Sequence, residues 1–166
     1  MHVADQELLS RLLDEHGAAL VLYAQQWSGS PEDVVQEAFI QLMQQRPLPN
    51  NVVGWLYRVV RNGAISASRA AARRVRHETA AGGNCEPWFK HSLDEVVDAG
   101  AAVAALESLP IEDREVIVLR IWGGRSFDEI AELIGKSTST AHRHFETALD
   151  TLRQTCLHGM KRGSQQ

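Results

Sequence analysis

GRSFDEIAELIGKSTSTAHRHFETALDTLR, residues 124–153, decides the fold of the chain, because it has the pattern of two helices joined by a tight turn. In the first helix, apolar residues recur at i, i+3, i+4 and i+7 and so share one face: Phe127, Ile130, Ala131 and Ile134. Gly135 is predicted to end this helix, since glycine readily takes the left-handed conformation of a helix terminus. Either Ser137 or Thr138 is suited to cap the next helix. The second helix is expected to bury an apolar stripe: Ala141, Phe145, Ala148, Leu149 and Leu152.

Polar and cationic side chains occupy the outer face at the start of this second helix. They are Thr140, His142, Arg143 and His144. A helix-turn-helix points this end of its second helix into the major groove of DNA, so the pattern predicts DNA recognition. A plain helical hairpin with a solvated polar face has the same spacing, and the motif alone does not separate the two interpretations.

A second basic region lies upstream, between Trp55 and Arg76. It contains six arginines and no acidic residue: Arg58, Arg61, Arg69, Arg73, Arg74 and Arg76. Apolar residues at helical spacing predict an amphipathic helix with an arginine-rich face, which suits phosphate groups. Trp55, Tyr57 and Asn62 add stacking surfaces and a base-edge hydrogen bonder, as proteins that hold single-stranded nucleic acid require. At least one of the two aromatic residues is expected to pack in the core instead.

Two other interpretations of the arginine helix compete with nucleic-acid binding. It could lie on an anionic membrane surface, but its apolar residues are mostly Ala and Val and offer little area to bury in lipid. It could also be a solvated helix. The sequence contains no run of eighteen apolar residues, so no membrane-spanning helix is predicted.

The remaining helices follow from proline, glycine and cap residues. The first is expected from about Asp5 to Trp27, broken or bent near Gly17, with an inward side of Leu8, Leu9, Leu12, Leu13, Leu20 and Leu22. The second should run to about Gln45, with Ser30 as cap and Pro31 in its first turn. Further helices are predicted at Asp94–Leu106 and Ile111–Trp122. The fold class is therefore all-α, with two small helical domains at residues 1–76 and 94–166 and a linker at 77–93.

Net charge and cysteine content limit the functions and the cellular compartment that the chain can have. The net charge is −4, from 17 basic and 21 acidic residues. Long-range attraction to DNA should be weak, which fits a subunit delivered to DNA by a larger partner better than an autonomous repressor. Two cysteines, Cys85 and Cys156, form no paired framework, so a reduced, cytoplasmic chain without a signal segment is expected.

Neither a metal site nor a catalytic site is predicted. His142 and His144 diverge by about 200° on a helix, and zinc pairs use i, i+3 or i, i+4 spacing. His77, Cys85 and His91 are irregularly spaced, which favours chance. There is no phosphate-binding glycine loop, H-E-x-x-H or G-x-S-x-G motif, so no cofactor is implied.

Two segments of the chain resemble one family. Residues Pro31 to Arg74, with EDVVQEAFIQLM followed by GWLYRVVRNGAISASRAAARR, resemble region 2 of bacterial sigma factors of the small, extracytoplasmic-function group. Residues Ala105 to Arg153, beginning ALESLPIEDREVIVLRIW, resemble region 4 of the same group. The second segment alone is close to many regulators, but the pair in this order is specific. The resemblance implies a promoter-specificity subunit whose partners are core RNA polymerase and promoter DNA, with an anti-sigma factor as a further candidate partner.

The resemblance also implies roles for individual residues. The residues that match the surface for docking on core polymerase form a polar stripe: Asp33, Gln36 and Glu37. The alternative interpretation of this stripe is a solvated helix face. The loop Arg46–Asn51 matches the loop that captures a flipped base of the minus-ten element, although it is shorter than usual. Minus-ten contacts are assigned to Asn50, Asn51, Trp55, Arg58, Arg61, Asn62, Arg69 and Arg73. Minus-thirty-five contacts are assigned to Lys136, Ser137, Thr138, Thr140, His142, Arg143 and His144.

One departure from the family pattern and two alternative functions accompany this prediction. Glu146 and Thr147 stand where the family has further basic residues, so the second helix is expected to grip DNA more loosely than is usual. An autonomous two-domain helix-turn-helix regulator would bind duplex DNA by itself, as a dimer at paired half-sites. A nuclease carrying such a motif would cleave DNA in the presence of divalent ions.

Overall fold

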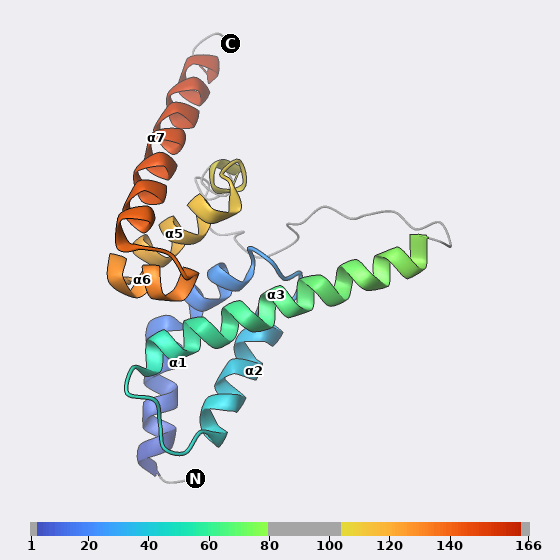
Figure 1. Cartoon of the computed structure of the whole chain (residues 1–166), viewed down its shortest axis with the longest axis vertical. Coiled ribbons are helices and arrows are strands. Elements are labelled where there is room, and N and C mark those ends of the chain that lie inside the picture. The colour runs from blue at the N-terminus through green and yellow to red at the C-terminus, as the bar shows by residue number, and fades with distance from the viewer. Residues whose placement is uncertain (1–2, 80–103, 164–166) are drawn as a thin grey trace. The chain divides into compact units, whose positions relative to one another are not determined.

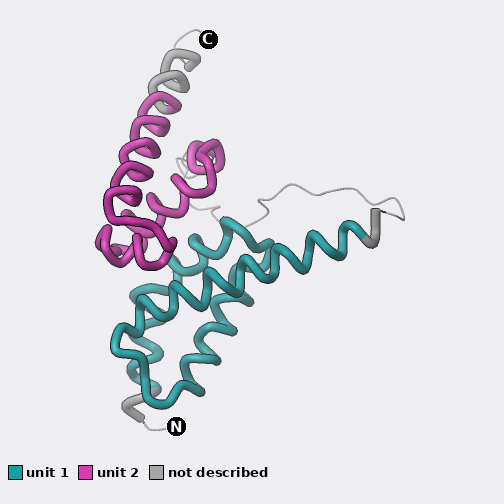
Figure 2. The backbone as a smooth tube through the Cα atoms, in the orientation of Figure 1, with its two compact units in different colours: residues 1–90 teal, residues 91–166 magenta. Residues whose placement is uncertain are grey.

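The computed structural model describes the backbone of residues 3–79 and 104–163 and the side chains of residues 6–76 and 104–155. Within these ranges the chain is built from α-helices and contains no β-strand, which confirms the all-α fold class (Figure 1). Two compact units make up the chain, residues 1–90 and 91–166 (Figure 2). The predicted linker begins inside a helix, because α3 continues to Thr79, and residues 80–93 lie outside the described part.

Three helices form unit 1: α1 (Val3–Ala24), α2 (Pro31–Gln44) and α3 (Val52–Thr79), each packed against the other two. The core consists of large side chains with almost no exposed surface: Leu20, Tyr23, Leu42, Leu56, Tyr57 and Val60. Tyr57 packs edge-on against Tyr23, with the ring centroids 5.3 Å apart. One of the two aromatic residues of the arginine helix therefore belongs to the core, as the sequence predicts.

Helix α1 differs from its prediction. It is continuous through Gly17, because a glycine inside a helix costs only about 1 kcal/mol and packing against α2 and α3 offsets that cost. It ends at Ala24, short of the predicted Trp27. Leu13, which the sequence pattern assigns to the inward side, is 52% exposed. The neighbouring Leu12 is buried, and adjacent side chains on a helix diverge by about 100°, so the two cannot both face the core.

The start of α2 is built differently from the predicted cap. Ser30 occupies the cap position, but its hydroxyl makes no capping hydrogen bond. Its backbone N–H donates instead to Ser28 Oγ at 3.2 Å. Pro31 stands at the first helical position, and Glu32 and Asp33 in the first turn favour the positive end of the helix dipole.

Unit 2 contains α5 (Ile111–Ile121), α6 (Phe127–Ile134) and α7 (Thr138–Gly163). Residues 104–107 are also helical, and the rest of the helix predicted at Asp94–Leu106 lies outside the described residues. Helix α5 packs on both α6 and α7, and these two pack on each other. The buried centre combines Val116, Ile117, Leu119, Ile130, Ala141 and Ala148. The predicted pair of helices around Gly135 is thus present.

Arg114 fixes the turn that precedes α5. Its Nη2 donates to the backbone carbonyls of Glu107 and Leu109, both at 2.9 Å. Burial lowers the pKa of this guanidinium, while the nearby carboxylate of Glu107 raises it. Both bonds anchor α5, the helix on which α6 and α7 rest.

Candidate nucleic-acid interface

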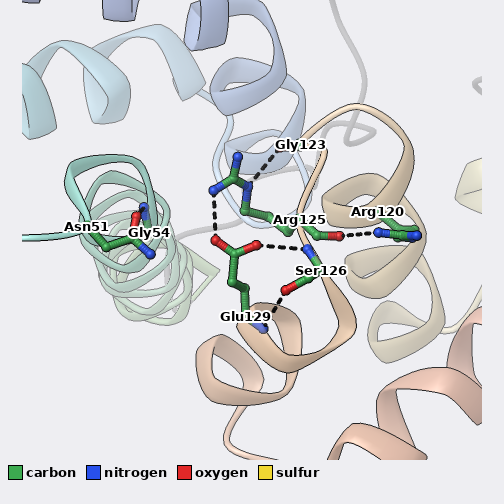
Figure 3. A network of polar contacts seen from close by, with 7 residues as sticks. All are labelled: Asn51, Gly54, Arg120, Gly123, Arg125, Ser126 and Glu129. Atoms are coloured by element: carbon green, nitrogen blue, oxygen red, sulfur yellow. Dashed lines mark hydrogen bonds and ion pairs between the residues drawn. The ribbon is translucent and has the colours of Figure 1, made fainter.

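A network of polar contacts around Arg125 fixes the turn between α5 and α6 (Figure 3). Arg125 donates from Nε to the Gly123 carbonyl at 2.9 Å, and its Nη1 lies 3.0 Å from Glu129 Oε1. Arg120 Nη1 donates to the Arg125 carbonyl at 2.9 Å. Ser126 and Glu129 form a capping box, with N–H to side-chain oxygen distances of 2.8 and 3.3 Å. The spacing S-x-x-E is the signature of this box, and the sequence prediction missed it.

The turn between α6 and α7 has the predicted glycine. Gly135 has a φ of 67°, a left-handed conformation that is strained for residues with a side chain. The backbone N–H of Lys136 donates to the Ala131 carbonyl at 3.0 Å, which closes the end of α6.

Ser137 is the cap of α7, which settles the choice between Ser137 and Thr138. Ser137 Oγ accepts from the Thr140 N–H at 3.2 Å. Thr138 Oγ1 instead donates to Asp128 Oδ1 at 2.8 Å and so ties the start of α7 to α6. Two residues predicted to contact the minus-thirty-five element thus hold the start of α7 in place.

The start of α7 presents polar residues to solvent. Lys136, Ser137, Thr138, His142 and Arg143 are exposed, and Thr140 is half-buried. The His142 ring lies 4.0 Å from the Phe127 ring, measured between centroids. The Arg120 guanidinium lies 4.8 Å from the centroid of Phe127. A guanidinium from α5, a phenyl ring from α6 and an imidazole from α7 therefore pack together.

His144 differs from the other predicted recognition residues. Its side chain is only 24% exposed, and its Nδ1 lies 2.5 Å from Oδ1 of Asp113 on α5. Asp113 is itself buried, with a side chain 8% exposed. The two residues are 31 positions apart in sequence, so no local pattern could have indicated this pair.

The loop before α3 ends in a cap that the sequence did not predict. Asn51 Oδ1 accepts from the Gly54 N–H at 2.9 Å, and Figure 3 draws these two residues as sticks. The Asn51 carbonyl accepts from the Trp55 N–H at 2.9 Å. A Cβ on Gly54 would lie 2.7 Å from Asn51 Nδ2. The missing side chain at Gly54 therefore leaves room for the cap. Asn50 is exposed, and Trp55 is half-buried.

Helix α3 presents the other residues predicted to contact the minus-ten element. Those that are exposed are Arg58, Asn62, Arg69 and Arg73. Arg61 is half-buried, with its guanidinium 5.9 Å from the ring centroid of Trp27. Trp27 was missed as a partner because it follows the end of another helix.

The predicted docking stripe on α2 is accessible. Asp33, Gln36 and Glu37 are all exposed. Glu37 Oε1 accepts from Gln41 Nε2 at 3.1 Å, one turn further along.

Among the described side chains, no three His, Cys, Asp or Glu residues gather as a metal site. Cys85, His91 and the side chain of His77 lie outside that part of the chain. In the same part, no helix combines the length and apolar character needed to cross a membrane.

Both units match models of sigma-factor regions. The model of sigma-70 region 2 matches residues 12–74, and the model of sigma-70 region 4 matches residues 99–152. The ECF RNA polymerase sigma factor SigL of Mycobacterium tuberculosis is 31% identical over 160 residues, which span 92% of this chain and 90% of SigL. The chain belongs to the extracytoplasmic-function sigma factors.

Other relatives agree with this family. The probable RNA polymerase sigma factor RfaY of Xanthomonas campestris pv. campestris is 27% identical over 139 residues, or 76% of this chain and 34% of RfaY. The sigma factor RpoE of Bartonella quintana, solved with the anti-sigma factor NepR, matches with a TM-score of 0.70 at 20% identity, over 91% of this chain and 97% of RpoE. CnrH, solved with the cytosolic domain of CnrY, matches with a TM-score of 0.56 at 24% identity, over 90% of this chain and 87% of CnrH. At these identities the likeness concerns the fold.

This sigma factor is a promoter-specificity subunit of RNA polymerase that acts in transcription initiation. Region 2 and region 4 occur together in the predicted order, which does not favour an autonomous regulator.

Proposed function

We propose that unit 1 of this sigma factor holds the opened minus-ten strand and that unit 2 reads the minus-thirty-five duplex. The arginine stripe of α3 carries the proposal: Arg58, Arg69, Arg73 and Arg76 are exposed and fall within about 60° of the helix surface at 100° per residue. From Arg58 to Arg76 the stripe extends about 27 Å at 1.5 Å per residue. It contains no acidic residue that would repel phosphate groups.

The loop before α3 is the proposed site of base capture. Asn50, Asn51 and Trp55 lie where the loop meets the stripe, and offer amides and an indole surface to an unstacked base. Arg61 and Asn62 follow on the next turn of the helix. Extruding a base costs a few kcal/mol, which contacts in the loop and along the arginine stripe must offset.

Unit 2 is proposed to read duplex DNA with the start of α7. Arg143 can donate two parallel hydrogen bonds to a guanine edge, while Lys136, Thr138 and Thr140 suit phosphate oxygens. Glu146 is exposed, with Oε1 at 3.9 Å from His142 Nδ1, and places negative charge near the DNA. This supports an interface that grips DNA weakly without help from polymerase.

Transcription in vitro tests the function itself. Core polymerase, with and without this protein, is incubated with a library of genomic fragments, and the transcript starts are mapped. The proposal expects new starts that share two elements at a fixed spacing. No starts beyond those of core enzyme alone would overturn it, and divalent-ion-dependent cleavage of the fragments would favour a nuclease.

The exposed stripe on α2 is proposed to dock on core polymerase. Reversing charge with Asp33→Lys and Glu37→Lys should leave the fold intact, since both side chains are exposed, and should weaken co-purification with core enzyme at least tenfold, or about 1.4 kcal/mol. Asp14→Lys with Glu15→Lys is the matched control, an equal reversal on exposed positions of α1. Equal recovery of core enzyme by both double variants would remove the stripe from docking.

Further properties belong to this proposal. The chain performs no bond chemistry, acts in the cytoplasm together with polymerase, and is controlled by an anti-sigma factor. The last point is supported by the two structural neighbours that were solved with NepR and CnrY. Proteins that co-purify with the tagged chain in the absence of core polymerase are added to the transcription assay. Inhibition identifies the anti-sigma factor, and full transcription with all of them contradicts its existence.

A further inference from the structure

The hydrogen bond between His144 and Asp113 joins the recognition helix to the helix beneath it. His144 Nδ1 lies 2.5 Å from Asp113 Oδ1, and the two side chains are 24% and 8% exposed. An ionised carboxylate can only accept hydrogen bonds, so His144 donates from Nδ1. The contact is short and shielded from water, which makes it stronger and more directional than a surface ion pair.

The position of His144 on α7 agrees with an inward role. Ala141 and Ala148, three residues before and four residues after it, have no exposed surface. Residues at this spacing share one face of a helix, so His144 lies on the stripe that packs on the rest of unit 2. Arg143 is about 100° away and is exposed.

Alanines at these two buried positions do little to fix how α7 is rotated. An alanine has no side-chain atom beyond Cβ, so these two positions give little resistance to a turn or slide of α7. Its rotation depends on contacts elsewhere, such as those of Phe145 with Phe127 and of Thr138 with Asp128. A directional hydrogen bond resists such motion. A turn of 20° would move a point at the outer helix radius by about 2 Å. Hydrogen bonds to a base form over a spread of only about 0.5 Å, between roughly 2.7 and 3.2 Å, so a displacement of this size would break one.

We propose that His144 is a positioning residue, which through Asp113 sets the rotation of α7 and so aims Arg143 at the bases, and that it does not itself read a base. The inference rests on the proposed reading of the minus-thirty-five element by α7. It divides the predicted recognition residues into one that aims the helix and others that touch DNA.

Two substitutions of His144 separate its ring nitrogens. In His144→Asn, the amide nitrogen lies near the place of Nδ1, so the bond to Asp113 is kept while the outer nitrogen is lost. In His144→Gln, the amide reaches the place of Nε2, so the outer donor is kept while the bond to Asp113 is lost. A positioning role predicts that His144→Asn retains transcription that depends on the minus-thirty-five element and that His144→Gln loses it. A base-reading role predicts the opposite.

The assay is transcription by holoenzyme from a randomised minus-thirty-five library, compared with a template that initiates independently of that element. The ratio of the two outputs removes any change in the amount of folded protein. His144→Gln, His144→Ala and Asp113→Ala should each lower this ratio by roughly tenfold, the effect of losing a charge-assisted hydrogen bond. Combining His144→Ala with Asp113→Ala should add little, because the two residues act as a pair. Asp113→Asn, which keeps an acceptor, should retain most of this ratio, and His144→Gln still tests the loss of the bond if Asp113→Ala does not fold.

The base profile provides the decisive comparison. Arg143→Ala is the control for a base-reading residue and should flatten the preference at one or two positions. His144→Ala and Asp113→Ala should alter only those same positions. Two outcomes would overturn the positioning role. The first is a base preference that is lost in His144→Ala but kept in Asp113→Ala. The second is transcription that His144→Gln retains and His144→Asn does not. If the wild-type holoenzyme shows no minus-thirty-five preference, the proposed function fails, and the positioning role falls with it.

Discussion

At the residue scale, the Asn51 side chain caps a helix and is also proposed to contact DNA. Its Oδ1 accepts from the Gly54 N–H at 2.9 Å and caps α3. The two hydrogens of its Nδ2 are then the groups that suit a base or a phosphate oxygen. The cap and the proposed DNA contact therefore use different atoms of one amide, which substitutions can separate.

Substitutions at Asn51 should separate stability from promoter melting. Asn51→Ala should lower the free energy of unfolding by about 1 kcal/mol, the usual cost of a lost cap, and should also reduce transcription. Asn51→Asp keeps the cap and adds favourable charge at the helix N-terminus, so its stability should match the wild type. Its transcription should fall, because it exchanges a donor for a negative charge near DNA.

Chemical unfolding and transcription of the same preparations check this separation. Gly54→Ala gives a second route, since its Cβ would lie 2.7 Å from Asn51 Nδ2 and displace the cap without changing Asn51 itself. An Asn51→Asp variant that unfolds as easily as Asn51→Ala would refute the capping role.

Contacts that depend on local backbone conformation could be predicted from the sequence, and contacts that depend on how helices pack could not. Gly135 was predicted correctly as a helix end, because left-handed backbone is a local property of glycine. Ser30 was wrong as a side-chain cap, since its backbone N–H bonds to Ser28 instead. The bond between His144 and Asp113 depends on how two helices pack, and nothing near either residue indicates it.

At the element scale, α3 continues beyond the part that α1 and α2 cover (Figure 1). Every residue from Ala71 to Arg76 is exposed, so this end of the helix is surrounded by solvent. Its arginines do not face one way: Arg69, Arg73 and Arg76 lie on the proposed DNA side, and Arg74 points about 100° or more away from them.

Arg74 is thus an internal control for the arginine stripe. Arg69→Ala and Arg73→Ala should each weaken promoter binding by holoenzyme by about 1 to 2 kcal/mol, equally for all sequences. Each should also reduce the slope of log K against log salt by about 0.7, the value for one phosphate contact on single-stranded DNA. Arg74→Ala should leave both quantities unchanged. A salt titration of holoenzyme binding measures them, and an equal effect of Arg74→Ala would show diffuse charge rather than a stripe.

The elements themselves were predictable where periodicity is strong. The sequence prediction of α5, α6 and the start of α7 is confirmed to within a residue, because each helix has a sharp start or stop signal. Helix α1 is less well predicted, since its many leucines do not distinguish Leu12 from Leu13. Only packing decides which of two adjacent leucines faces the core.

At the scale of the whole molecule, charge is divided unevenly along the chain. Residues 1–76 carry 8 basic and 7 acidic residues, and residues 77–166 carry 9 and 14, which gives +1 and −5 and recovers the net charge of −4. The half that is proposed to read duplex DNA is therefore the acidic one. Arg143 on α7 and Lys136 in the turn before it are exposed cations, but Glu146 on α7 is exposed as well.

This distribution predicts that the free protein binds promoter duplex poorly. At physiological salt its dissociation constant should be no better than roughly 10⁻⁴ to 10⁻⁶ M, the range of non-specific binding. The reason is that few phosphate contacts are available before polymerase adds its own, while the acidic half repels the duplex. A mobility-shift titration of the same promoter with free protein and with holoenzyme measures the difference.

Glu146→Lys provides a matched test of this electrostatic argument, since it reverses an exposed charge beside His142 on the proposed DNA face. It should tighten binding of the free protein severalfold at low salt, with less effect near 1 M, where the Debye length falls to about 3 Å. The same reversal at exposed Glu15 of α1 should have little effect. Nanomolar, sequence-specific binding by the free wild-type protein would contradict the argument, because a chain that finds its promoter alone would not need polymerase to deliver it.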